Sequence, residues 1–98
     1  MSDGELQEGS SYESALFARQ HKLNNLYVII DWNRYQACGK IENILDLTTA
    51  FQFFKKTLPH IEIIKTVKGE GISFMRHRNE WHYYNLTPTL LDKSLKEL

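Results

Sequence analysis

The chain has 98 residues, of which 42% are hydrophobic and 24% are charged, and its 12 basic residues balance its 12 acidic ones. That length allows a single domain, residues 1–98, with one modest core, and the composition is that of a globular rather than a disordered protein. A neutral chain has no general attraction for nucleic acid or for an anionic membrane, so neither is expected as a partner. Cys38 is the one cysteine, which suits a reducing cytoplasm and excludes an internal disulfide or a cysteine-built zinc site. The longest apolar run, residues 26–30, is too short for a membrane span.

The first half of the chain predicts a helix followed by a strand. Ser10 and Glu13 form a capping-box pattern, and the helix formers after them predict a helix that continues to about His21. Residues 26–31 are a continuous run of apolar residues ending in an aspartate. Such β-branched and aromatic runs are typical of strands that are buried on both faces.

The second half predicts a helix, a second strand and a last helix. Apolar residues recur at helical spacing over residues 46–58, and the proline that follows ends the helix. Residues 61–67 predict a strand, so strand, helix and strand form a βαβ unit with a parallel sheet and a right-handed crossover. Thr87 and Pro88 are typical of the start of a helix. The expected fold is therefore α/β, a small parallel sheet with flanking helices.

Two polar residues lie where ligands often bind in such folds. Asp3 precedes Gly4 at a predicted helix entrance, and Asn33 follows the carboxyl end of the first predicted strand. A carboxylate and an amide oxygen together suit Mg²⁺ or Ca²⁺. From residue type alone, a helix cap and a turn residue are the more ordinary roles for Asp3 and Asn33.

The segment from Ser2 to Gly9 and the later Asp31-Trp32-Asn33 stand at the spacing of a motif of the transketolase family, which residues 5–31 resemble almost throughout. In that family the motif binds thiamine diphosphate through a metal ion. The resemblance implies a shortened thiamine-diphosphate-binding fold.

The resemblance also assigns roles to single residues. It implies that Asp3, Asn33 and the main chain of Tyr35 bind the metal, Mg²⁺ or Ca²⁺, and that Gly4 offers its amide to the diphosphate. A second similar block runs from Lys65 to Met75 and continues to Glu80-Trp81-His82. It implies that His82 reaches the active site near the diphosphate and the substrate.

The chain also departs from the family pattern. Ser2 replaces the first glycine of the motif, and the strand that delivers this motif is expected to be missing. A strand and a helix are expected to be missing between Leu45 and Thr48. Tyr83 replaces a glycine after His82, and the pyrimidine-binding half of the enzyme has no counterpart.

The resemblance implies a transferase of carbohydrate metabolism that moves a two-carbon ketol unit between sugar phosphates. With half of the site present, we expect the chain to be inactive alone and to act as a homo-oligomer or with a partner chain that carries the pyrimidine half. The alternative is a non-catalytic remnant or an association module derived from a transketolase. Trp32, Tyr83 and Tyr84 are aromatic residues that such a shortened domain is expected to present to a partner.

Overall fold

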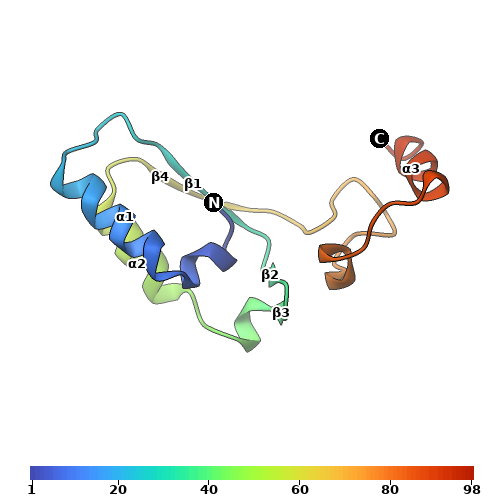
Figure 1. The fold of residues 1–98 in the computed structure, drawn as a ribbon, viewed down its shortest axis with the longest axis horizontal. Helices are drawn as coiled ribbons and strands as arrows, with labels where there is room; N and C mark the ends of the chain where they lie inside the picture. Colours follow the sequence, from blue (N-terminus) through green and yellow to red (C-terminus); the bar gives the residue numbers. More distant parts are fainter.

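The computed structural model describes residues 1–98 and shows a small α/β core continued by an extended C-terminal arm (Figure 1). Here η denotes a short 3₁₀ helix. In chain order the elements are η1 (Gly4–Gln7), α1 (Gly9–Gln20), β1 (Val28–Trp32), β2 (Tyr35–Gln36), β3 (Gly39–Lys40), η2 (Ile41–Asn43), α2 (Thr48–Thr57), β4 (Ile61–Lys65), η3 (Asn79–His82) and α3 (Pro88–Leu95).

The two longer strands, β1 and β4, form a parallel pair, which confirms the predicted βαβ unit. Ile30 of β1 lies opposite Ile63 of β4 in the register. The chain start adds a third, very short segment on the other side of β1, because Ser2 forms an isolated parallel bridge with Asp31. The amide of Asp3 donates to the carbonyl of Asp31 at 3.0 Å. The motif therefore reaches the site from beside β1.

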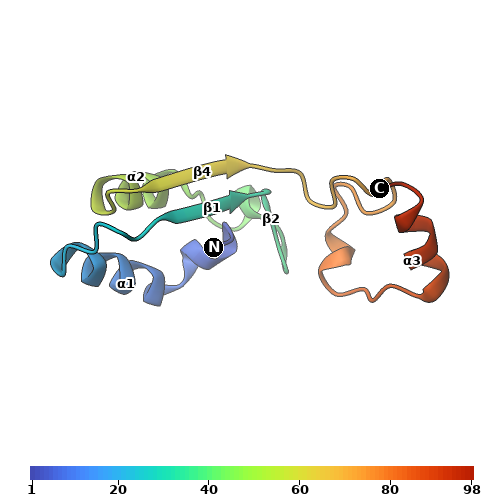
Figure 2. The same ribbon diagram turned by 90° about the horizontal axis from the view of Figure 1, so that it is seen from above.

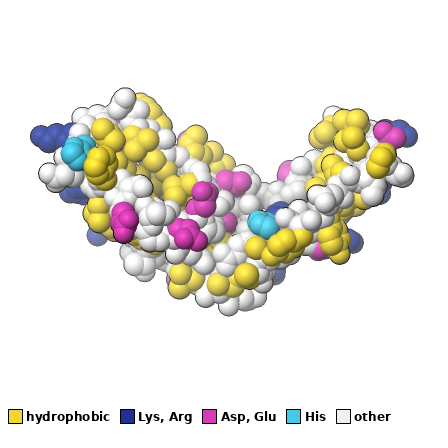
Figure 3. Space-filling model, in the orientation of Figure 1, with side chains coloured by type: hydrophobic (Ala, Val, Ile, Leu, Met, Phe, Trp, Pro, Cys, Tyr) yellow, Lys and Arg dark blue, Asp and Glu magenta, His cyan; other side chains and the backbone are white.

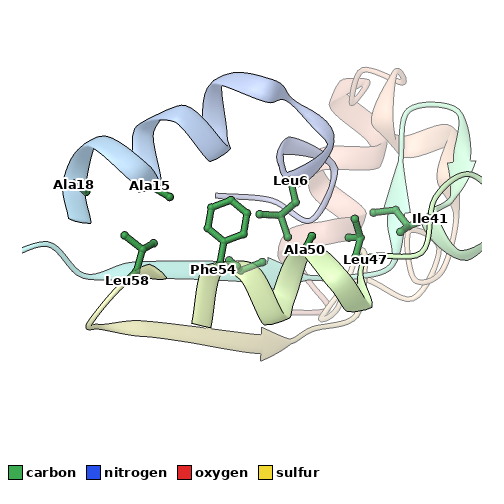
Figure 4. Close-up of a cluster of buried hydrophobic side chains, with 9 residues drawn as sticks. Leu6, Ala15, Ala18, Ile41, Leu47, Ala50, Phe54 and Leu58 are labelled. Carbon is green, nitrogen blue, oxygen red and sulfur yellow. The ribbon is translucent and has the colours of Figure 1, made fainter. Parts of the chain in front are cut away.

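The core is a cluster of nine buried apolar residues between the two N-terminal helices and one face of the sheet. Phe54 of α2 lies at its centre with 1% exposure, and Leu6 and Ile30 are fully buried (Figure 4). Tyr12 of α1 packs against Phe53 and Phe54, with ring centroids 5.1 Å from each. Because both helices contribute to this one cluster, they cover the same face of the sheet.

The opposite face of the sheet is uncovered, so the prediction of a strand buried on both faces is wrong. Within β1 only Ile30 is buried, and its neighbour Ile29 is 52% exposed. On β4 the exposed fraction of Ile64 is 40%. Side chains alternate between the two faces of a strand, so the apolar run places half of its residues on a face that no helix of this chain covers.

The helix boundaries agree with the predictions except at the start of α1. That helix begins at Gly9, before Ser10, and its N-cap residue makes no capping hydrogen bond through its side chain, so the capping box is wrong. At α3 the prediction is confirmed, since the Thr87 hydroxyl accepts from the amide of Leu90 at 3.3 Å. None of the helices combines the length and apolar character needed to cross a lipid bilayer.

Residues 67–98 form the arm, which extends beyond the end of β4 (Figure 2). The radius of gyration is 16.3 Å, compared with about 13 Å for a compact domain of 100 residues. All nine core residues lie between Leu6 and Leu58, and Ser94 is the arm's one buried residue. The arm meets the core where Asn79 Nδ2 donates to the carbonyl of Ala37 at 3.1 Å. Space-filling spheres show the resulting crescent, with a hollow between core and arm (Figure 3).

Candidate functional site

Asp3 is the most unusual polar residue of the chain, because its side chain is fully buried. It lies beside the carboxyl end of β1, where the bridge between Ser2 and β1 holds it. One carboxylate oxygen, Oδ2, accepts from the amide of Arg34 at 2.7 Å. The other, Oδ1, is buried and has no hydrogen-bond partner. Asp3 precedes η1 but does not cap it through its side chain, so the ordinary role of a helix cap does not apply.

Burial raises the pKa of the Asp3 carboxyl above its ordinary value, because the charged form loses its hydration. The backbone amides of Arg34 and Gly4 act in the opposite direction, and the nearby charge of Asp31 raises the pKa further. A buried carboxylate with a free oxygen is costly unless a cation or a proton compensates its charge. The surroundings of Asp3 therefore favour a positive group at Oδ1.

A tight turn after β1 brings the other predicted residues to the same place. Asn33 Oδ1 accepts from the amide of Tyr35 at 2.8 Å, which fixes the turn. Arg34 between them has a φ of 70°, a left-handed conformation that is uncommon for a residue with a side chain. This conformation accompanies the Arg34 amide's bond to Asp3. The hydrogen bond between Arg34 and Asp3 therefore links the N-terminal part of the motif to the part that follows β1.

An open hollow of about 490 Å³ adjoins this turn. Its wall includes four of the five residues that the resemblance singles out: Gly4, Asn33, Tyr35 and His82. Asp3 lies immediately beside it in the chain but does not line it. Within the hollow His82 Nδ1 lies 3.4 Å from Lys68 Nζ.

Gly4 lies in the wall of this hollow, where an added Cβ would make an ordinary contact, 3.4 Å from Gln36 Oε1. Tyr83, which replaces the family's glycine after His82, has an ordinary φ of −118°. The backbone at that position therefore does not require glycine here.

The donor atoms suit a hard divalent cation in kind. They are a carboxylate oxygen without a partner on Asp3, the amide oxygen of Asn33 and the main-chain carbonyl of Tyr35, and Mg²⁺ and Ca²⁺ prefer such oxygens. Asp3 is the one carboxylate in this set, and no group of three or more His, Cys, Asp or Glu side chains is placed to hold a metal. A cation held here would need oxygens from its ligand or from water to complete its shell.

Several polar side chains of the hollow were not predicted to line it, including those of Glu5, Gln7, Gln36 and Lys68. Gln7 Nε2 is a second buried polar atom without a partner. Lys68 lies inside the second block that resembles the family, directly before Gly69, and this position was the signal that could have indicated a place in the site. No local pattern connects the glutamines with Asn33, because the fold alone brings them together.

These features define a small α/β domain with a polar hollow at the carboxyl end of β1. Over its whole length the chain is 32% identical to an apulose-4-phosphate transketolase subunit of Phocaeicola vulgatus and covers 44% of that protein. It is 34% identical to the corresponding subunit of Actinobacillus succinogenes, with 98% of the chain and 44% of the relative aligned. It is also 31% identical to human transketolase, of which it covers 20%. No protein-family profile matches the chain.

The resemblance to the transketolase family is thereby confirmed, and the chain is related to one part of these proteins. It spans less than half the length of the two bacterial subunits and a fifth of the human enzyme. The alignment with the Phocaeicola protein extends over 125 positions, more than the 98 residues available here. The relative therefore has additional residues within the aligned region, which agrees with the expected shortening of the chain.

Proposed function

We propose that this chain provides the diphosphate- and metal-binding part of a transketolase-type site. The observation that carries the proposal is the buried Asp3 Oδ1, which has no hydrogen-bond partner. Within a protein this small, a fully buried carboxylate with an unused oxygen lowers stability. Binding a cation gives that oxygen a function.

Each proposed role, apart from that of Lys68, is the one that the family resemblance implies for that residue. Asp3 Oδ1, Asn33 Oδ1 and the Tyr35 carbonyl would hold Mg²⁺ or Ca²⁺, and the Gly4 amide would donate to a phosphate oxygen. His82 and its neighbour Lys68 would offer polar and positive groups to the diphosphate or to a sugar phosphate. When bound, thiamine diphosphate supplies the nucleophilic carbon for two-carbon ketol transfer.

We further propose that catalysis needs a second chain. Two of the relatives are named as subunits of an apulose-4-phosphate transketolase, and a third is named as a subunit of a 6-deoxy-6-sulfo-D-fructose transketolase. A partner carrying the pyrimidine half would supply the acid–base group that activates the cofactor. Such groups typically contribute about 10²–10⁴-fold to rate. A reducing cytoplasm is the proposed location, since Cys38 is free.

Titration calorimetry with thiamine diphosphate, with and without Mg²⁺, tests the binding role. We expect weak binding that requires the metal, because the carboxylate of Asp3 and the diphosphate repel each other without a cation. Asp3→Ala should abolish the heat of binding. Asp92→Ala, which removes an exposed carboxylate of α3, should leave it unchanged. Tight binding without metal would contradict the proposed geometry.

A ketol-transfer assay at saturating cofactor and Mg²⁺ tests the catalytic role. We expect no turnover by the chain alone, and turnover that depends on Asn33 when a pyrimidine-half partner is added. Turnover by the chain alone at an ordinary enzyme rate of about 1–10³ s⁻¹ would refute the need for a partner.

A further inference from the structure

A second hollow lies where β1 and β4 end, beside the one described above. Its volume is about 450 Å³, and its lining includes Asn33 and Tyr35, which also line the first hollow. Both strands run toward this end, so Thr66 and Val67 after β4 meet the turn after β1 there (Figure 2). In open α/β sheets, ligands bind outside the carboxyl ends of the strands. The second hollow therefore occupies a position at which this class of fold binds ligands.

The second hollow has an excess of positive charge. Its lining contains the cationic side chains of Arg34, Lys40 and Lys65, together with His77, and one carboxylate, that of Glu42. Lys40 Nζ lies 3.9 Å from Glu42 Oε1, so these two charges offset each other. Arg34 and Lys65 form no ion pair. A cleft lined by charges of one sign attracts ions of the opposite sign, so this hollow favours an anion.

The indole ring of Trp32 holds the two unpaired cations in place. The guanidinium carbon of Arg34 lies 5.3 Å from the ring centroid, and Lys65 Nζ lies 5.0 Å from it. Phe51 of α2 packs on the same ring with its centroid 5.2 Å away. A cation over an indole face is attracted to it, so both groups are positioned before any ligand binds. The two like charges repel each other, and an anion between them would offset that repulsion.

The charges of the two hollows suit different kinds of ligand. Glu5 and Glu8 line the first hollow together with Lys68, so binding of an anion there depends on the proposed metal ion. In the second hollow the cations of the chain itself are in excess, so an anion needs no metal. Asp31 does not line the second hollow, and its Oδ1 already accepts from the Thr66 hydroxyl.

Among common anions, a phosphate group fits this arrangement best. Arg34 comes from the turn after β1, Lys40 from β3 and Lys65 from β4, so the donors approach from three different segments. A tetrahedral phosphate offers oxygens in several directions and carries up to two negative charges, whereas a carboxylate is planar and carries one. The guanidinium fork also matches two phosphate oxygens at once.

We propose that the second hollow binds the phosphate group of a phosphate monoester without a metal ion. Arg34 and Lys65 contact the phosphate oxygens, and Lys40 is a further donor in the same wall. Because the two hollows share Asn33 and Tyr35, the rest of the ester can extend toward the first hollow. That the ester is a sugar-phosphate substrate rests on the proposed function, but the phosphate site itself does not.

Titration of the ¹⁵N-labelled full chain, followed by two-dimensional NMR with a chelator present, tests this proposal. The probes are inorganic phosphate and glycerol 3-phosphate, which has no aldehyde that could react with lysine, and glycerol is the control ligand. The variant Arg34→Gln/Lys65→Gln removes both unpaired cations and keeps the Arg34 amide that donates to Asp3. Its matched control is Lys56→Gln/Lys96→Gln, which removes the same charge at two exposed positions outside the hollow. Circular dichroism would verify that each variant is folded.

We expect saturable shifts of the amide signals of Lys65 and Thr66 with both phosphate probes and none with glycerol. The dissociation constant for glycerol 3-phosphate should be on the order of 1 mM. Arg34→Gln/Lys65→Gln should raise it by about tenfold or more, because hydrogen bonds to charged groups are lost, and the lysine control should not. Asp3→Asn should bind the ester as the wild type does, which separates this site from the proposed cofactor site.

Four results would overturn the proposal. The first is the absence of saturable shifts with either phosphate probe. The second is equal weakening in the lysine control, which would show that only net charge attracts the anion. The third is binding of inorganic phosphate alone, since the hollow would then hold a free ion and no ester. The fourth is binding that requires Mg²⁺ or is lost in Asp3→Asn, because the phosphate would then occupy the first hollow.

Discussion

Replacing Asp3 by asparagine separates the stability that the buried carboxylate costs the folded chain from the metal binding that it is proposed to provide. In the absence of metal the wild-type carboxylate is fully buried, with Oδ2 bonded to the Arg34 amide at 2.7 Å and Oδ1 without a partner. Asparagine keeps an oxygen for the Arg34 amide and places its Nδ2 where Oδ1 has no partner, so the two side chains differ mainly in the buried charge. A buried polar group without a partner costs about 1–3 kcal/mol, and more when charged. We therefore expect Asp3→Asn to stabilise the metal-free chain by about 1 kcal/mol, or about 4–8 °C in Tm.

The sign of the pH dependence follows from the raised pKa of Asp3. Below its ordinary value of 3.8 the carboxyl is protonated in both the folded and the unfolded chain, so the substitution should have little effect. As the pH rises from there, the unfolded chain ionises first, and the folded state loses stability until the pH has passed the raised pKa. The gain in stability from Asp3→Asn should therefore be absent near pH 3 and complete at neutral pH.

Thermal unfolding followed by circular dichroism, with and without Mg²⁺, is the measurement. Mg²⁺ should stabilise the wild type, by about 2.7 kcal/mol at 100 times its dissociation constant, and should have little effect on Asp3→Asn. Asp92→Asn is the matched control, because Asp92 is exposed on α3 and should behave as the wild type does. A lower Tm for Asp3→Asn in the absence of metal would refute the reasoning. Equal changes in Tm with Mg²⁺ for the wild type and Asp3→Asn would also refute it.

Two further substitutions test the packing of the core and the geometry of the arm. Phe54→Ala should lower the free energy of unfolding by about 3–5 kcal/mol, a large part of the stability of so small a domain. Phe17→Ala should lower it far less, because the Phe17 side chain is 61% exposed. Comparable urea midpoints for the two variants would contradict the assigned core. Gly69→Ala should destabilise the arm, because Gly69 has a φ of 73° and an added Cβ would lie 2.4 Å from the Met75 carbonyl oxygen. The control is Gly9→Ala, because nothing lies within 4 Å of its new methyl group. We expect faster amide hydrogen exchange around residues 69–75 in Gly69→Ala alone. Equal exchange in the two variants would contradict this expectation.

The sequence by itself determined the order of the three α-helices and the two longer strands and most of their boundaries, whereas the short β2–β3 pair was not predicted. Helical spacing of apolar residues located α2, and the Thr87–Pro88 pair located the start of α3. These predictions succeeded because they depend on backbone propensity, capping and the period of apolar residues within about one turn or one strand. The motif spacing also predicted that Asp3 and Asn33 belong to one site, and Asp3 accepts from the amide of Arg34, the residue that follows Asn33.

Only the tertiary structure decided what depends on contacts between distant segments. The run at residues 26–31 predicted a strand buried on both faces, but the number of layers that cover a strand is set by the rest of the fold, and here both helices pack on one face. The capping box failed for a related reason: the helix begins at Gly9, so its N-cap is Glu8, two residues before Ser10. The neighbouring Ser11 hydroxyl donates to the carbonyl of Glu5 in η1. The free oxygen of Asp3 was likewise invisible in the sequence. Burial and hydrogen-bond satisfaction are properties of a residue's neighbours in space, and no local pattern of residues specifies them.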